Sequence, residues 1–130
     1  EYGGRWWIFA ALEPIQGMGT FHELHLFHSD HPLSSDWHPH PENPVIASAD
    51  RARPGGPIID DRGSLYRVGQ DCTIRYGRTV GMYRIERLDP VRYEEVEVAR
   101  VDTSGVPSLL GFHHLATSQR FLLADAWTRR

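Results

Sequence analysis

The sequence predicts an all-β fold, and three observations support that prediction. Apolar and aromatic residues fall in short runs of strand length, turn signals rich in glycine and proline recur along the chain, and no segment has a sustained helical period. The 130 residues have the length of one ordinary domain, and 40% of them are hydrophobic, which is enough to build a core. We therefore expect roughly nine short antiparallel strands in a single domain.

The first third of the chain predicts two strands followed by a long loop. Arg5–Leu12 (RWWIFAAL) is a continuous apolar run after two glycines, which is typical of a buried strand. Phe21–Ser29 (FHELHLFHS) alternates with mixed residues on both faces, so neither face is plainly exposed to solvent. Repeated prolines between Asp30 and Pro44 leave room only for a short edge strand near Trp37.

The central stretch Arg51–Tyr76 (RARPGGPIIDDRGSLYRVGQDCTIRY) predicts a β-hairpin with polar groups at both ends. Ile58 and Ile59 form a short apolar run, residues 60–63 (DDRG) are a turn tetrad, and the strand resumes at Leu65. The Gly-Gly pair at 55–56 lets the backbone pass close to a neighbouring element.

The last part of the chain predicts four more strands. Arg78–Leu88 and Tyr93–Val101 alternate apolar and charged residues on either side of an Asp-Pro turn, and Gly111–Ala116 is a shorter run. Arg120–Trp127 has no period of two and follows a serine suited to capping a helix. The pattern of this segment is compatible with either a terminal strand or a terminal helix.

Composition excludes several classes of function. The net charge is −3 and all 14 basic residues are arginine, so no broad positive field is available to hold nucleic acid. No run approaches the roughly 20 apolar residues of a membrane span, and the single Cys72 cannot form an internal disulfide. These features predict a soluble, cytoplasmic protein, although secretion stays open because the chain begins at Glu1 rather than at methionine.

The eight histidines do not form a metal-binding motif. His22 and His25 are three residues apart in a predicted strand, whereas the zinc-protease motif needs histidines four apart on a helix. Prolines around His38 and His40 indicate a loop. We expect neither a metal ion nor a cofactor.

The order of the motifs resembles that of a known family. RARPGGPIIDDRGSLYRVGQDCTIRYG resembles the five-bladed β-propeller domain at the N-terminus of glucosamine inositolphosphorylceramide transferases and related bacterial proteins, where Arg-Pro-Ala-Gly, Gly-x-Leu-Tyr-Arg and Gln-Asp-Cys follow in that order. LHLFHSDHPLSSDWHPHPENPVI is similar to a passage within the blades of the wider propeller superfamily of arabinanases and fructosidases. This chain departs from the family pattern at Gly55, where alanine is usual, and at Val68, where proline is usual.

The resemblance implies a partial propeller, because five blades need roughly twice this length. About two and a quarter blades of antiparallel strands would be present, covering residues 1–50, 51–106 and 107–130. Gly56–Asp60 would be the innermost strand of the complete blade, and Tyr93–Val101 its outer edge. Glycine-aromatic segments at Gly4 and Gly63, spaced as a blade-sized repeat, agree with this division.

The resemblance also implies a ligand site at the central funnel of the propeller. The candidate residues are Arg51, Arg53, Asp71, Arg75, Tyr76, His113 and His114. Adjacent strand residues point to opposite faces, so one of the two histidines should face the funnel. Asp71 is close in sequence to Arg67 and Arg75, which would keep the carboxylate ionised and suited to accepting sugar hydroxyls. An internal salt bridge for Asp71 and a packing role for the histidines are the alternatives.

Three functional hypotheses follow. The first is a carbohydrate-recognition or glycosyltransferase-associated propeller module that binds a sugar or glycan. The second is a fragment of a glycoside hydrolase, for which no second carboxylate of the required pair is identifiable. The third is a structural or interaction protein whose charged residues are all satisfied internally.

The last expectation concerns assembly. An open array of blades exposes strand edges and apolar faces, here at Trp6, Ile8 and Phe121, which a neighbour would have to cover. We therefore expect a homodimer or a higher closed oligomer in which strands of one copy complete the sheets of another.

Overall fold

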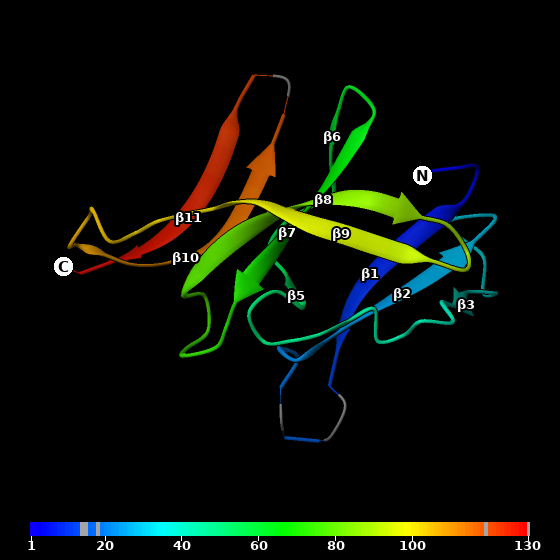
Figure 1. Cartoon of the computed structure of the whole chain (residues 1–130), viewed down its shortest axis with the longest axis horizontal. Coiled ribbons are helices and arrows are strands. Elements are labelled where there is room, and N and C mark those ends of the chain that lie inside the picture. Colours follow the sequence, from blue (N-terminus) through cyan, green and yellow to red (C-terminus); the bar gives the residue numbers. More distant parts are fainter. Residues whose placement is uncertain (14–15, 18, 119, 130) are drawn as a thin grey trace.

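The structure is a computed structural model that describes residues 1–13, 16–17, 19–118 and 120–129, and every regular element in these ranges is a β-strand. The strands are β1 (Trp6–Leu12), β2 (Glu23–Ser29), β3 (His38–Pro39), β4 (Ile46–Ala47), β5 (Arg53–Pro54), β6 (Ile59–Asp61), β7 (Ser64–Asp71), β8 (Thr79–Leu88), β9 (Tyr93–Arg100), β10 (Leu109–Thr117) and β11 (Leu122–Thr128). The strands pair antiparallel in three sheets that follow one another along the chain (Figure 1). The all-β prediction is confirmed, and the segment left open near the C-terminus is a strand, β11.

The first sheet contains β1, β2, β3 and β4. β1 pairs with the whole of β2, from Trp6 opposite Ser29 to Leu12 opposite Glu23. β3 and β4 both pair with the other edge of β2, β3 near its end and β4 near its start, and the chain leaves this edge between them. Asn43 closes this gap: its side-chain carbonyl accepts from the Leu26 N–H, and its amide donates to the Leu26 carbonyl, both at 2.8 Å. The predicted short strand near Trp37 is β3.

The second sheet runs in the order β5, β7, β8, β9, with β6 beside β5 on the same edge of β7. The prediction for its inner strand is wrong in its bounds, because pairing with β7 stops after Pro54 and resumes only at Ile59. Gly55 keeps one backbone hydrogen bond to β7, from its N–H to the Val68 carbonyl at 2.8 Å, and residues 56–58 then leave the sheet. The Gly55 carbonyl accepts from the Leu115 N–H of β10 at 2.8 Å. β9 at the outer edge agrees with the prediction to within one residue.

The hairpin between β6 and β7 turns as the sequence predicts. Arg62 and Gly63 form its two-residue loop, with φ angles of 54° and 87°. Two successive positive φ values are typical of the turn whose twist matches paired strands. The Asp60 carboxylate accepts from the Gly63 N–H at 2.8 Å and fixes the turn.

Two apolar clusters join the three sheets. Leu24, Leu26 and Ile46 of the first sheet pack against Leu88 and Tyr93 of the second. Val68 and Val80 of the second sheet pack against Leu115 of β10 in the third. The third sheet has only β10 and β11, and β10 lies against the ends of β7 and β8 (Figure 1). Within the described residues, no helix has the length and hydropathy needed to cross a membrane.

Candidate ligand-binding site

Arg53 lies where residues from all three sheets meet. Its guanidinium carbon is 5.4 Å from the centroid of the Phe21 ring, which precedes β2, and 5.0 Å from the centroid of the Tyr76 ring, in the β7–β8 turn. The two rings are 5.9 Å apart at an interplanar angle of 53°, so the cation lies against two aromatic faces. We call Arg53, Phe21, Tyr76, His113 and Trp127 the arginine–aromatic cluster.

The third sheet supplies the other wall of this cluster. His113 on β10 meets Tyr76 edge to face at 5.3 Å and meets Trp127 on β11 at 6.2 Å. Its Nδ1 atom is 2.6 Å from the carboxylate of Asp125. The hydrogen bond to His113 holds the pKa of the Asp125 carboxyl below its usual range. Asp125 is therefore ionised at neutral pH and orients the imidazole.

Arg53 has no acidic partner among the described residues, where no carboxylate lies within ion-pair distance of it. One Nη atom donates to the carbonyl and the hydroxyl of Thr20. The Nε atom is buried and has no hydrogen-bond partner in the same part of the chain. Because the two rings and a neutral threonine leave the charge uncompensated, this guanidinium is suited to an additional acceptor.

A small pocket opens beside the cluster. It has a volume of about 210 Å³ and is lined by Arg75, Tyr76, Gly77, Leu110, Gly111 and Trp127. Trp127 is 53% exposed and Tyr76 is 39% exposed, so both aromatic side chains are open to solvent. The backbone segments at Gly77 and Gly111, which line this pocket, are closely packed. The Phe112 N–H donates to the Gly77 carbonyl at 3.0 Å, and a Cβ on Gly111 would lie 2.3 Å from that carbonyl oxygen.

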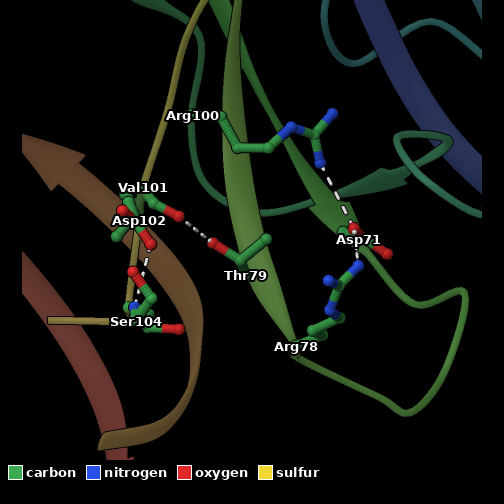
Figure 2. Close-up of a pocket in the computed structure, with 8 residues that line it drawn as sticks. Asp71, Arg78, Thr79, Arg100, Val101, Asp102 and Ser104 are labelled. Atoms are coloured by element: carbon green, nitrogen blue, oxygen red, sulfur yellow. Dashed lines mark hydrogen bonds and ion pairs between the residues drawn. The ribbon is translucent and has the colours of Figure 1, made fainter. Parts of the chain in front are cut away.

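Asp71 lies in a different pocket, of about 390 Å³, at the end of β7 (Figure 2). Its carboxylate accepts from Arg78 at 3.0 Å, from Arg100 at 3.3 Å and from the backbone and hydroxyl of Thr73. Burial alone would raise the pKa of Asp71, but the Thr73 hydrogen bonds and the two arginines outweigh it and lower the pKa. The ionised state was predicted correctly.

The predicted partners of Asp71 were wrong. Arg67 lies four residues away on the same strand, a separation of about 13 Å along an extended chain, and Arg75 lies exposed in the turn. Arg100 instead reaches Asp71 from β9, across β8. Asp71 is thus satisfied by an internal network, as the alternative interpretation anticipated.

Arg67 belongs to a buried network that the sequence did not indicate. Its side chain is 1% exposed and makes a bidentate pair with Glu95, at 2.7 and 2.6 Å. Tyr93 donates its hydroxyl proton to the same carboxylate at 2.5 Å, and the Arg51 carbonyl accepts from Arg67 at 2.8 Å. Burial opposes the charge of Arg67, but Glu95 raises the pKa of Arg67 above its usual value.

The structure brings only some of the predicted site residues together. Arg53, Tyr76 and His113 belong to the arginine–aromatic cluster and Arg75 lines its pocket, whereas Asp71 lies apart and His114 is exposed. Arg51 contributes its carbonyl to the Arg67 network, and its Nε atom is buried without a partner among the described residues. Sequence reasoning missed Phe21, Asp125 and Trp127, because each is adjacent to Arg53 or His113 only through folding.

The structure also describes the surroundings of Cys72 and of the histidines. Burial raises the pKa of the Cys72 thiol despite the nearby charge of Arg53, so the thiol stays protonated. In the described part of the chain, no group of three or more His, Cys, Asp or Glu side chains is arranged to hold a metal ion.

Comparison with known proteins identifies the family of the chain. Residues 1–108 match the family model described as "Glucosamine inositolphosphorylceramide transferase 1, N-terminal". The chain belongs to this family. The match includes Phe21, Arg53 and Tyr76 of the cluster, whereas His113 and Trp127 follow the matched residues.

Curated relatives agree with this assignment. The chain is 42% identical over 100 residues to the glucosamine inositolphosphorylceramide transferase 1 of japonica rice, and 37% identical over 100 residues to that of Arabidopsis thaliana. In each case the alignment covers 75% of this chain and 13% of the relative. The chain thus spans about an eighth of the length of the relatives it matches. No solved structure matches it significantly.

Proposed function

We propose that this chain is a carbohydrate-recognition module associated with glycosyl transfer, and that the arginine–aromatic cluster with its pocket is the binding site. One observation carries the proposal: an arginine without an acidic partner among the described residues lies against the Phe21 and Tyr76 rings, and Tyr76 and Trp127, both exposed, line a small pocket beside it. Sugars combine apolar ring faces with hydroxyl groups, so they need both kinds of contact at once.

Each part of the cluster has a role in this proposal. The exposed rings of Tyr76 and Trp127 offer faces on which a sugar ring can stack. Arg53 and Arg75 donate hydrogen bonds to sugar oxygens. His113, oriented by Asp125, keeps its other ring nitrogen for a hydroxyl group.

The association with glycosyl transfer rests on the family. The rice and Arabidopsis relatives carry the name of a transferase, and the alignment with this chain covers 13% of the length of each. We infer that the module presents or retains a glycan, because its pocket is lined by arginine and aromatic side chains that suit sugar contacts.

We also propose that the three sheets are consecutive blades of a β-propeller. Each sheet is antiparallel, each succeeds the last along the chain, and each packs on its neighbour through an apolar cluster. In a propeller, funnel residues come from several blades, which agrees with a cluster drawn from all three sheets.

Glycan-array binding tests the proposal. We expect the chain to bind a limited set of oligosaccharides, and we expect Arg53→Ala and Trp127→Ala each to weaken binding at least tenfold, equal to a loss of about 1.4 kcal/mol. Arg84→Ala is the matched control, because Arg84 lies in an exposed pair with Glu86 on β8, outside the proposed site.

The other outcomes separate the alternatives. Release of reducing sugar from a substrate panel would replace binding with hydrolysis as the function. Absence of binding to any glycan would leave a structural or interaction role.

A further inference from the structure

Gln70 is a buried side chain that joins the second sheet to the third beside the arginine–aromatic cluster. It lies on β7 directly opposite Arg53 of β5, and it is 4% exposed. Its Nε2 atom donates to the Pro54 carbonyl at 3.3 Å and to the His113 carbonyl, on β10, at 2.8 Å. One amide group therefore bonds to the backbone next to Arg53 and to the backbone of His113, which lie on two sides of the cluster.

The chemistry of the Gln70 amide matches these two acceptors. A glutamine amide nitrogen has two N–H donors, and a backbone carbonyl can only accept, so the nitrogen rather than the oxygen must face Pro54 and His113. The amide oxygen accepts from the Cys72 thiol at 3.8 Å. The nitrogen and the oxygen of this buried amide therefore both have partners, which fix its orientation.

His113 needs such a partner because it is the extra residue of a β-bulge. Where β10 pairs with β11, the register advances by two residues on β10, from Phe112 to His114, but by one residue on β11. A bulge redirects the side chain of its extra residue and leaves that residue outside the regular hydrogen bonds of the strand pair. The carbonyl of His113 is bonded to Gln70 on β7 instead.

Residues on either side of His113 are held to the second sheet by backbone contacts. The Phe112 N–H donates to the β7–β8 turn at 3.0 Å, and the Leu115 N–H donates to the Gly55 carbonyl at 2.8 Å. These contacts dock the strand, whereas Gln70 makes its contact at the bulged residue itself. The position of the His113 ring in the cluster therefore depends on the Gln70 amide.

We propose that Gln70 is a positioning residue of the ligand site, whose amide holds the His113 bulge at a fixed distance from Arg53. This role rests on the proposed function, since Gln70 would act on the same site through its neighbours and without touching the ligand. Loss of the amide leaves two carbonyls without this donor and lets the bulge shift. The His113 ring, which meets Tyr76 edge to face at 5.3 Å, would then lose its place in the cluster.

The first test needs no ligand. Gln70→Met keeps roughly the length and volume of the side chain but has no N–H donor. Nuclear Overhauser contacts between the ring protons of His113 and Tyr76 should be clear in the wild type and weakened in this variant. Contacts between the rings of Phe9 and Tyr93, which are 5.9 Å apart in the first two sheets, should be unchanged.

The second test is the affinity for the best oligosaccharide from the glycan array, measured by calorimetry. We expect the dissociation constant of Gln70→Met to rise about tenfold. Tyr93→Phe is the matched control, because it removes one buried hydrogen-bond donor, to Glu95 at 2.5 Å, in the interface between the first two sheets. Its dissociation constant should stay within about twofold of the wild type. Urea denaturation shows how much stability each change costs.

The wild type alone also tests the proposal. The side-chain amide protons of Gln70 should exchange slowly with solvent, and exchange at the rate of a free amide would overturn the proposal. An unchanged affinity of Gln70→Met, or equal weakening by Gln70→Met and Tyr93→Phe, would overturn it too and leave the proposed function in place. A wild type that binds no glycan would overturn the proposed function, and this role of Gln70 with it.

Discussion

At the scale of single residues, the arginines differ in how fully protein acceptors satisfy them. Arg67 and Arg100 are saturated by protein acceptors, Arg67 through Glu95 and Arg100 through Glu97, Asp71 and the Tyr83 hydroxyl. Arg53 has only Thr20 and two aromatic rings in the described structure. Arg67 on β7 therefore serves the fold, and we propose that Arg53 on the neighbouring strand β5 contacts a ligand.

Removing Arg67 should destabilise the fold strongly. Arg67→Gln leaves the Glu95 carboxylate buried with only the Tyr93 hydroxyl, and breaking one side of a buried ion pair costs about 3–5 kcal/mol. Urea denaturation measures the change. The matched control is Arg84→Gln, whose exposed pair with Glu86 should be worth less than about 1 kcal/mol. Equal effects of the two changes would show that the buried pair is not a structural anchor.

Asp71 should give the protein part of its acid sensitivity. Its pKa is lowered in the folded state, so its contribution is present above the ordinary carboxyl pKa, near 3.9, and is lost as the pH falls through the folded pKa. Asp71→Asn should therefore cost about 1.5–3 kcal/mol at neutral pH and make the loss of stability below about pH 4 shallower. Asp61→Asn, at an exposed carboxylate, is the control for denaturation curves recorded across this range. If the stability of Asp71→Asn falls with decreasing pH as steeply as that of the wild type, Asp71 does not contribute to the acid sensitivity.

At the scale of elements, the broken inner strand connects the second sheet to the third. β5 and β6 leave a gap at residues 55–58, and the gap brings the Gly55 carbonyl to the Leu115 N–H. Glycine is required because a Cβ on Gly56 would lie 2.0 Å from the Leu115 carbonyl oxygen, which is backbone and cannot move aside easily. The interruption of the strand is thus the docking point for β10.

Gly56→Ala should loosen the third sheet without unfolding the first. We expect a loss of about 1–3 kcal/mol, as for other overpacked contacts, and faster hydrogen exchange at the Leu115 amide than at amides of β2. Gly105→Ala is the control, since no atom lies within 4 Å of the added methyl there. Uniformly faster exchange in all three sheets would mean that the docking contact is not local.

Local features of the elements could be predicted from the sequence, and contacts between distant segments could not. Period-two alternation located β8 and β9, and the DDRG tetrad located the β6–β7 turn, because both depend on neighbouring residues. The gap between β5 and β6 depends on Leu115, more than 50 residues away. For the candidate site, Arg53 and Tyr76 were expected because they stand at the two ends of the central hairpin, but Trp127 and Asp125 carried no local signal.

At the scale of the whole molecule, the outer strand of the third sheet is unusually open. All residues of β11 are exposed, and Phe121, Leu122 and Leu123 have exposed fractions of 74%, 69% and 67%. Apolar side chains beside an unpaired strand edge are a typical surface for association. We propose that a second copy of the chain covers this edge.

Light scattering coupled to size exclusion tests the assembly. We expect a homodimer or a larger closed oligomer at micromolar concentration, and we expect Leu123→Lys to shift it towards monomer because the charge would be buried at the contact. Glu94→Lys, on the exposed edge of the second sheet, is the control. A monodisperse wild-type monomer that melts cooperatively would contradict this proposal.

The central claim is that a glycan binds where Arg53 meets the aromatic rings, and nuclear magnetic resonance tests it most directly. The measurement is a titration of isotope-labelled protein with the best oligosaccharide from the array, following the Trp127 indole N–H and the Arg53 Nε–H signals. We predict saturable shifts of both signals, which Arg53→Gln weakens and Arg84→Gln leaves unchanged. Saturable shifts confined to Asp71, Arg78 and Arg100, or no saturable shifts anywhere, would contradict the claim.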